Sequence, residues 1–258
     1  MNLLHAVIFG IVEGITEFLP ISSTGHLILT ARLLGILQSD FLKSFEIAIQ
    51  LGAILSVIVL YWRSLLIDFR VMKRVTAAFI PTAILGFIFY KAAKSNLLGN
   101  DKVVLWALFL GGIFLIIFEL LYREKKDARE GLCEISYSQA ALIGVIQTIA
   151  IIPGVSRAAA TICGGLILGL KRKTIVEFSF LLAVPTMLAA TGLDLMKSAA
   201  AFTSQQFLFL AAGFLVSFAV AIISIKFLLN FIKRNNFISF GVYRVIAALI
   251  FWFMGGAR

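Results

Sequence analysis

Charged residues are scarce in this sequence: Asp, Glu, Lys and Arg make up 14% of its 258 residues, while 61% are hydrophobic. A soluble domain carries about 25% charged and about 45–50% apolar residues. The shortage excludes a soluble globular protein and predicts an integral membrane protein. The apolar runs also lack the strand-length alternation of a membrane β-barrel. We therefore expect an all-α integral membrane protein whose spans are helices.

Cysteine is also rare: Cys133 falls in a charged loop and Cys163 in an apolar run. Two cysteines in such unrelated settings indicate neither a disulfide framework nor a metal site. The net charge of +10 does not indicate binding to nucleic acid, because Lys and Arg gather in short loops between apolar runs. Loops of this kind lie beside anionic lipid, so membrane lipid is the expected partner.

Two apolar regions are broken in the middle, the first by PISSTG and the second by PGVSR. Their arms, 2–19 with 26–37 and 138–152 with 158–170, are shorter than a comfortable span. Such breaks are tolerated at membrane depth only inside protein or beside a wet cavity. We predict two re-entrant helical hairpins whose tips meet near the middle of the bilayer. About six full spans complete the expected fold, at 41–62, 74–92, 103–122, 174–196, 206–229 and 237–254.

Basic residues set the expected orientation, because cytoplasmic loops carry an excess of Lys and Arg. This rule places both termini outside and the following loops in the cytoplasm: 63–74, 123–137, 171–173 and 230–236. We predict a single membrane domain, 1–258, with inverted repeats over about 1–122 and 138–254. The charged cytoplasmic loop 123–137 joins them. Inverted repeats with broken helices are typical of transporters.

The first broken region begins with two carboxylates, Glu13 and Glu17, which share one helix face at this spacing. Two adjacent carboxylates in a low-dielectric site repel each other or demand a cation. Hard oxygen ligands suit Mg²⁺ or Ca²⁺, so the pair is a candidate site for a divalent cation. The alternative is a pair that lines a wet crevice or forms an ion pair with Arg157. Because ionisable groups inside membranes are usually functional, we favour a catalytic role.

Hydroxyl groups and a histidine follow these carboxylates. Pro20 ends the first arm, and Ser22 and Ser23 occupy the turn before His26. A serine beside a base is the arrangement that activates a hydroxyl nucleophile. His26 is a candidate for that base or for the nucleophile itself. The alternative is a core histidine whose hydrogen bonds are satisfied.

The second break supplies a cation, Arg157, inside an apolar region, where a charge is costly unless an anion meets it. The guanidinium fork suits phosphate oxygens, and a helix that begins after Gly154 adds free N–H groups. Ser156 and Thr161 can donate further hydrogen bonds. We predict a phosphate-binding site here. A structural ion pair between Arg157 and a glutamate is the alternative, and the two can coexist.

We expect other polar residues within the apolar runs to have structural rather than catalytic roles. Glu46 and Gln50 share a helix face, and we expect them to brace the hairpins. Glu119, Asp194 and Arg244 lie near the ends of predicted spans, where an interfacial position is expected.

These residues fall in stretches that, taken together, resemble one family nearly end to end. EGITEFLPISSTGHL (13–27), FEIAIQLGAIL (45–55), PGVSR (153–157) and EFSFLLAVP (177–185) are similar to the undecaprenyl-diphosphatase family of bacterial membrane phosphatases, which is associated with bacitracin resistance. The resemblance implies hydrolysis of undecaprenyl diphosphate, a polyprenyl diphosphate lipid, to undecaprenyl phosphate, the carrier for peptidoglycan and other wall polymers. It also implies a multi-pass protein of the bacterial plasma (inner) membrane, dependence on a divalent metal, an active site facing the outer or periplasmic side, and a homodimer.

The family motifs transfer to individual positions of this chain. The acidic motif falls on Glu13 and Glu17. The hydroxyl and histidine positions of the family fall on Ser22, Ser23 and His26. Its phosphate-binding motif falls on Ser156, Arg157 and Thr161. The family usually continues the Ser-Arg pair with Ser-Gly, whereas Ala158 and Ala159 follow here.

Two rival functions remain beside the diphosphatase. Histidine-based lipid phosphatases use similar short motifs, but they need two well-placed histidines, and only His5 and His26 are present. A lipid-carrier flippase or small-anion transporter built on the same inverted repeat is the stronger rival. Release of phosphate in detergent, where no membrane separates two sides, distinguishes the phosphatase from the transporter.

Overall fold

The computed structural model describes residues 1–37, 39–97, 100–125, 127–198 and 203–253. Within these ranges the secondary structure is helical, and the one β-type contact is an isolated bridge between Arg129 and Leu170. The expected all-α class is therefore confirmed. The α-helices are α1 (Leu3–Thr16), α2 (Ser23–Leu33), α3 (Asp40–Leu60), α4 (Trp62–Leu66), α5 (Phe69–Asn96), α6 (Asp101–Leu121), α7 (Tyr137–Gln147), α8 (Arg157–Ile167), α9 (Arg172–Ser198), α10 (Ser204–Phe231) and α11 (Ile238–Phe253), with 3₁₀ turns η1 (Leu132–Glu134) and η2 (Thr148–Ile151).

Five of these helices are long and apolar enough to cross a membrane: α3, α5, α6, α9 and α10. Each coincides with one of the six predicted spans. The sixth predicted span corresponds to α11, which is apolar but has only 16 residues in the described part of the chain. That length is below the roughly 20 residues that a bilayer core requires.

The two broken regions form pairs of short helices, α1 with α2 and α7 with α8. Asn2 caps α1, since its side-chain oxygen accepts a hydrogen bond from the backbone N–H of His5. Ser136 and Gln139 form a reciprocal capping box at the start of α7. The segments 17–22 and 152–156 that join the arms are named here the first tip and the second tip.

The helices pack in pairs. α1 lies against α10 and α7 against α5, while α3 contacts both α10 and α9, α5 also contacts α9, and α6 pairs with α11. Glycine allows the closest approaches, because a Cβ atom at Gly10 would lie 2.7 Å from the carbonyl oxygen of Gly213. A Cβ atom at Gly144 would likewise collide with the carbonyl oxygen of Ala78. The main core includes Phe18, Leu19 and Ile21 of the first tip, and Phe18 makes an edge-to-face contact with Phe180.

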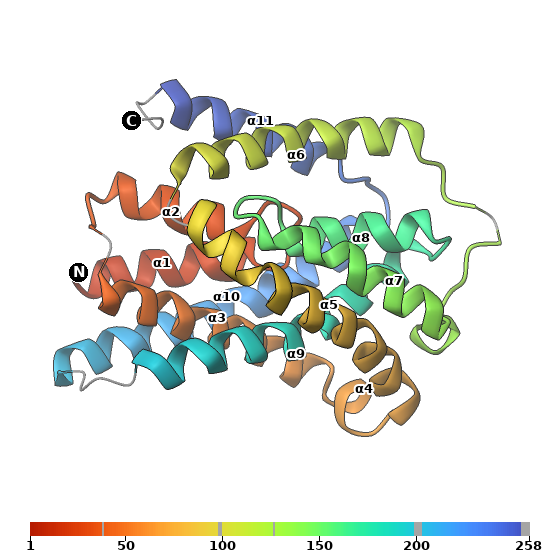
Figure 1. Cartoon of the computed structure of the whole chain (residues 1–258), viewed down its shortest axis with the longest axis horizontal. Helices are drawn as coiled ribbons and strands as arrows, with labels where there is room; N and C mark the ends of the chain where they lie inside the picture. Colours follow the sequence, from red (N-terminus) through yellow and green to blue (C-terminus); the bar gives the residue numbers. More distant parts are fainter. Residues whose placement is uncertain (38, 98–99, 126, 199–202, 254–258) are drawn as a thin grey trace.

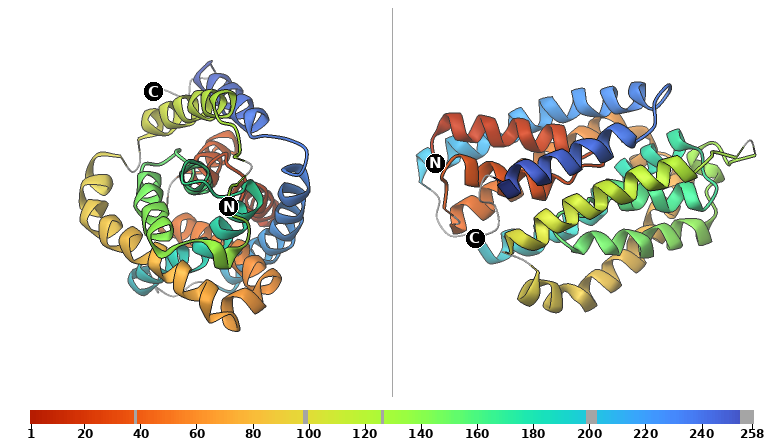
Figure 2. Two further views of the ribbon diagram at one scale, coloured as in Figure 1. Left: turned by 90° about the vertical axis from the view of Figure 1, so that its right-hand side faces the viewer. Right: turned by 90° about the horizontal axis from the view of Figure 1, so that it is seen from above.

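The N-terminus and the C-terminal end of α11 lie at one end of the long axis, and the connection from α6 to α7 lies at the other (Figures 1 and 2). The predicted position of the C-terminus itself concerns residues outside the described part of the structure. At the connection end, Arg172 forms a bidentate ion pair with Glu119. Glu119 lies two residues before the end of α6, as expected, and its side chain faces the protein, where only 2% of it is exposed. The side chain of Asp194 lies outside the described part of the structure.

Candidate functional site: a polar cavity between two helix starts

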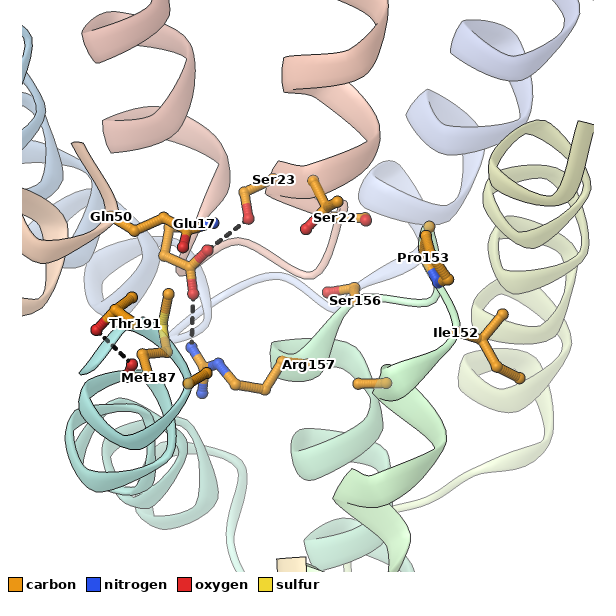
Figure 3. Close-up of a pocket in the computed structure, with 14 residues that line it drawn as sticks. Glu17, Ser22, Ser23, Gln50, Ile152, Pro153, Ser156, Arg157, Met187 and Thr191 are labelled. Atoms are coloured by element: carbon orange, nitrogen blue, oxygen red, sulfur yellow. Dashed lines mark hydrogen bonds and ion pairs between the residues drawn. The ribbon is translucent and has the colours of Figure 1, made fainter. Parts of the chain in front are cut away.

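The two tips meet around a cavity of about 250 Å³ (Figure 3). The first tip and the start of α2 contribute polar side chains from Glu17 and Ser23, and the second tip and the start of α8 contribute Ser156 and Arg157. The two broken regions therefore meet, as expected, at this cavity. Helices α3 and α9 close the cavity with further residues, among them Gln50, Met187, Ala190 and Thr191.

Matched serines shape the two tips. Ser22 and Ser156 have φ values of 73° and 77°, and they are the non-glycine residues with positive φ in the described chain. Each caps the helix that follows: the hydroxyl of Ser22 accepts from the N–H of Gly25, and that of Ser156 from the N–H of Ala159. Strained backbone of this kind costs about 1–3 kcal/mol and tends to lie at functional sites. The result is that α2 and α8 both begin at the cavity wall.

Glu17 connects the two tips. Its Oε2 accepts a hydrogen bond of 2.5 Å from the hydroxyl of Ser23, and its Oε1 lies 3.4 Å from Nη2 of Arg157. The Nη1 of Arg157 donates to the carbonyl oxygen of Ser179 at 2.8 Å, while its buried Nε has no partner in the protein. The predicted ion pair between Arg157 and a glutamate is present. Two of the five N–H donors of the guanidinium are thus used within the protein, and Nε is among those that are not.

Glu13 lies one turn before Glu17 and is fully buried. Both of its carboxylate oxygens, and one of Glu46, lack a hydrogen-bond partner in the protein. Described residues form no cluster of three or more His, Cys, Asp or Glu side chains. The unpartnered oxygens of Glu13 are the donor type that Mg²⁺ takes, but among the pair Glu13 and Glu17 it is Glu17 that lines the cavity.

His26 does not reach the hydroxyl of Ser23. Its Nδ1 lies 2.7 Å from the carbonyl oxygen of Ser22, and its Nε2 lies 2.8 Å from the hydroxyl of Tyr243, with the two rings stacked. A carbonyl oxygen can only accept, so Nδ1 carries a hydrogen, and neutral His26 accepts from Tyr243 through Nε2. The hydrogen-bond partner of Ser23 is Glu17 instead.

Thr161 lies behind the cavity rather than in its wall. The residue is fully buried, and its hydroxyl lies 3.1 Å from Oε1 of Gln147 and 2.9 Å from the carbonyl oxygen of Arg157. Gln147 also donates toward the hydroxyls of Thr82 and Thr186. The structure therefore places Thr161 in a network that supports the first turn of α8. The cavity wall contains the other predicted phosphate-binding residues, Ser22, Ser156 and Arg157.

The departure from the family pattern does not disturb α8. Ala158 is fully buried in the main core, and the backbone N–H of Ala159 makes the capping hydrogen bond to Ser156. A main-chain donor serves this cap, so a side-chain hydroxyl at 158 or a glycine at 159 is not needed for it.

Arg244, which was expected near a membrane interface, contributes more to the site than its sequence position predicts. The residue is fully buried, and its guanidinium contacts both tips through the carbonyl oxygens of Pro20, Gly154 and Val155. Gln50, which was expected only to brace the hairpins, lines the cavity. Two features of the sequence could have indicated these roles: Arg244 is a lone arginine inside an apolar run, and Gln50 lies one helical turn after Glu46.

The apolar helices and the charged cavity between two short-helix pairs define a multi-pass membrane protein with a polar site inside it. The model of the family "Bacitracin resistance protein BacA" matches residues 6–250, so the chain belongs to this family. It is 54% identical to an undecaprenyl-diphosphatase of Aquifex aeolicus over 96% of both chains. It is 51% identical to one from a Sulfurihydrogenibium species, covering 98% of this chain and 99% of that one, and 49% identical to one from Wolinella succinogenes over 98% of each.

Proposed function

We propose that this protein hydrolyses undecaprenyl diphosphate to undecaprenyl phosphate and inorganic phosphate. The named activity of its relatives supports this function, and so does the chemistry of the cavity. The observation that carries the proposal is the contact of Glu17 with both Ser23 and Arg157, which joins a nucleophile, a base and a phosphate ligand across two tips. The reaction recycles the lipid carrier of cell-wall polymers.

The cavity suits a diphosphate because positive ends of two helices surround it. The N-termini of α2 and α8 carry partial positive charge, and such ends bind phosphate. Arg157 adds a full charge and an unpartnered Nε donor. Phosphoryl transfer depends mainly on positioning and on stabilising charge, both of which these groups supply.

In the first chemical step, Oγ of Ser23 attacks the terminal phosphorus and Glu17 takes the hydroxyl proton. The bond between that phosphorus and the bridging oxygen breaks, and the departing lipid phosphate takes the proton from Glu17. Arg157 holds the oxygens of the transferred group. In the second step water attacks the phosphoserine, Glu17 takes a proton from the water, and Ser23 recovers it as the phosphate leaves.

His26 as the base, His26 as the nucleophile and direct attack by water are the variants of this scheme. The distance of 2.5 Å between Ser23 and Glu17 favours Glu17 as the base. In this scheme His26 holds the first turn of α2 through Ser22 and Tyr243.

Glu13 and Glu17 are the proposed ligands of a divalent cation, Mg²⁺ or Ca²⁺. The support is the pair of unpartnered carboxylate oxygens on Glu13, one helical turn from Glu17. When bound, the cation would supply positive charge toward the phosphate oxygens.

We propose that the two short-helix pairs are re-entrant hairpins in an inverted repeat that opens toward the outer side of the plasma membrane. The packing of the helices supports the repeat. In it, α1, α3, α5 and α6 correspond in order to α7, α9, α10 and α11. Under this correspondence the contact of α1 with α10 matches that of α7 with α5, and the contact of α3 with α10 matches that of α9 with α5. The same correspondence leaves α3·α9 and α6·α11 unchanged. The N-terminus and the C-terminal end of α11 lie at one end and the basic loops at the other, which supports the orientation.

Phosphate release from undecaprenyl diphosphate by purified protein in detergent tests the function, with Mg²⁺, Ca²⁺ or chelator present. We expect metal-dependent release that Glu17→Ala and Arg157→Ala abolish and that Arg234→Ala, at an exposed position, leaves intact. Absence of release from folded wild-type protein under every metal would contradict the phosphatase. Transport of the lipid carrier or of an anion would then be measured in vesicles.

A further inference from the structure

Arg244 is a fully buried cation on α11 that uses all of its donors on main-chain oxygens. Its Nη1 donates to the carbonyl oxygens of Pro20 at 3.3 Å and Val155 at 2.9 Å. Its Nη2 donates to those of Gly154 at 2.9 Å and Ala107 at 3.0 Å. The Nε completes the set with the carbonyl oxygen of Leu108 at 3.3 Å. A guanidinium has five N–H donors, so none is left unpaired.

These acceptors belong to three separate parts of the chain: the first tip, the second tip and the middle of α6. Arg244 forms no ion pair with the carboxylates in the described residues. A buried charge without a counter-ion is costly, so carbonyl dipoles must provide the compensation. The guanidinium is therefore bound where both tips present their carbonyl groups together. Separation of the tips would leave both the cation and those carbonyls unsatisfied.

A glycine makes room for this cation. Gly111 lies one turn after Ala107 on α6, and a Cβ atom there would collide with Nη2 of Arg244. The two helices also approach closely beside it, because a Cβ atom at Gly241 would lie 2.8 Å from the carbonyl oxygen of Gly112. A flexible side chain can often move away from an added methyl group. Here five hydrogen bonds hold the guanidinium, so movement means losing some of them.

We propose that Arg244 is a positioning residue for the reaction, setting the separation between the two tips and hence the placement of Ser23 and Glu17 relative to Arg157. This inference rests on the proposed phosphatase function. Arg244 acts through the backbone: the carbonyls that it binds lie two or three residues from Ser22, Ser23 and Arg157 in the sequence. Arg244 itself is absent from the cavity wall.

Kinetic variants test this role. Arg244→Lys keeps the charge but has three donors in place of five. We expect it to lower kcat on the order of 10²-fold, the effect of a misplacement of about 1 Å, and to change KM less than about threefold. Gly111→Ala keeps the arginine and displaces its guanidinium, so it should lower kcat in the same way. The matched controls Arg234→Lys and Gly86→Ala, at an exposed position and at a glycine with open space, should keep wild-type kcat.

Two outcomes separate positioning from support of the fold alone. For positioning, kcat per folded molecule falls, and the double variant of Arg244→Lys with Gly111→Ala loses less than the product of the two single losses, because both act on one contact. A lower melting temperature with unchanged kcat per folded molecule would overturn the proposal. If Arg244→Lys does not fold, Gly111→Ala still decides the matter.

A distance measurement makes the inference independent of activity. Spin labels at Thr24→Cys and Ile149→Cys, beside the two tips and both exposed, would report their separation after Cys133 and Cys163 are replaced. Arg244→Lys should lengthen or broaden that distance, and an unchanged distribution would contradict the proposal. If wild-type protein releases no phosphate while the labelled distance changes in Arg244→Lys, the proposed phosphatase function is wrong. The inference that Arg244 sets the separation between the tips is then still supported.

Discussion

The hydroxyl of Ser23 donates to Oε2 of Glu17 over 2.5 Å, and Arg157 approaches the other oxygen of the same carboxylate at 3.4 Å. A carboxylate in this position can take the proton of Ser23 without a histidine as intermediary. The same carboxylate also positions the guanidinium of Arg157, which follows the second tip. The relationship therefore shifts the expected base from His26 to Glu17.

Replacement of Glu17 by glutamine removes the proton acceptor while keeping the shape of the side chain. We expect kcat for phosphate release to fall about 10²–10⁴-fold, the usual contribution of a general base. Glu130→Gln is the matched control, because Glu130 is exposed and contacts Lys171 at the surface. Turnover within about tenfold of wild type in Glu17→Gln would exclude Glu17 as the base.

The serine mechanism predicts a phosphoserine intermediate at Ser23. Quenching in denaturant at neutral pH, which preserves both phosphoserine and acid-labile phosphohistidine, followed by mass spectrometry of the peptide that contains residues 13–27, should show one phosphate on that side chain. The proton transfer to Glu17 makes Ser23 the nucleophile that the geometry favours. Phosphate on His26 would identify the histidine as the nucleophile, and an unmodified peptide throughout turnover would support attack by water.

Tyr243→Phe tests the role of His26. The change removes the hydroxyl that contacts Nε2 and leaves the stacked rings in place. Because loss of one hydrogen bond is worth about 1–1.5 kcal/mol, we expect kcat to fall no more than about tenfold. The pH dependence of kcat should keep its wild-type midpoints. A shifted midpoint would show that His26 titrates in the rate-limiting step.

Metal dependence should involve Glu13 through its unpartnered oxygens. We expect chelator to abolish phosphate release and Mg²⁺ or Ca²⁺ to restore it. Glu13→Gln should raise the metal concentration needed for half-maximal release by at least about tenfold, since one anionic ligand is lost. A thermal shift on metal addition, measured without substrate, should weaken in parallel. Full activity in chelator would rule out the cation.

The buried pair of Glu119 and Arg172 should act on stability alone. Glu119→Gln leaves the cation opposite a neutral amide, and breaking a buried ion pair costs about 3–5 kcal/mol. We expect a lower melting temperature and an unchanged kcat for the folded fraction. Asp40→Asn breaks the exposed pair with Lys43 and should change stability by less than about 1 kcal/mol. A loss of kcat in Glu119→Gln would connect this end of the molecule to the site.

The sequence alone determined the helical membrane class, the two breaks and most of the cavity wall. These features depend on local chemistry: long apolar runs need helices, and proline with hydroxyl residues interrupts them. Glu17, Ser23 and Arg157 were identifiable because a polar residue inside an apolar run is energetically costly and is usually retained for function. The last predicted span, 237–254, agrees with α11 to within one residue at its start, and residue 254 lies outside the described part of the structure.

Tertiary structure decided what each polar residue contacts. His26 forms a hydrogen bond with Tyr243, which lies 217 positions away in the sequence. No local sequence pattern predicts that partner. Thr161 turns toward Gln147 because α7 and α8 pack together, and Arg244 is buried because both tips converge on it. Hydrogen bonds of buried groups are set by whichever segments arrive beside them. The sequence therefore identifies the polar groups of the site. The packing of segments that are distant in the sequence determines which hydrogen bonds those groups form.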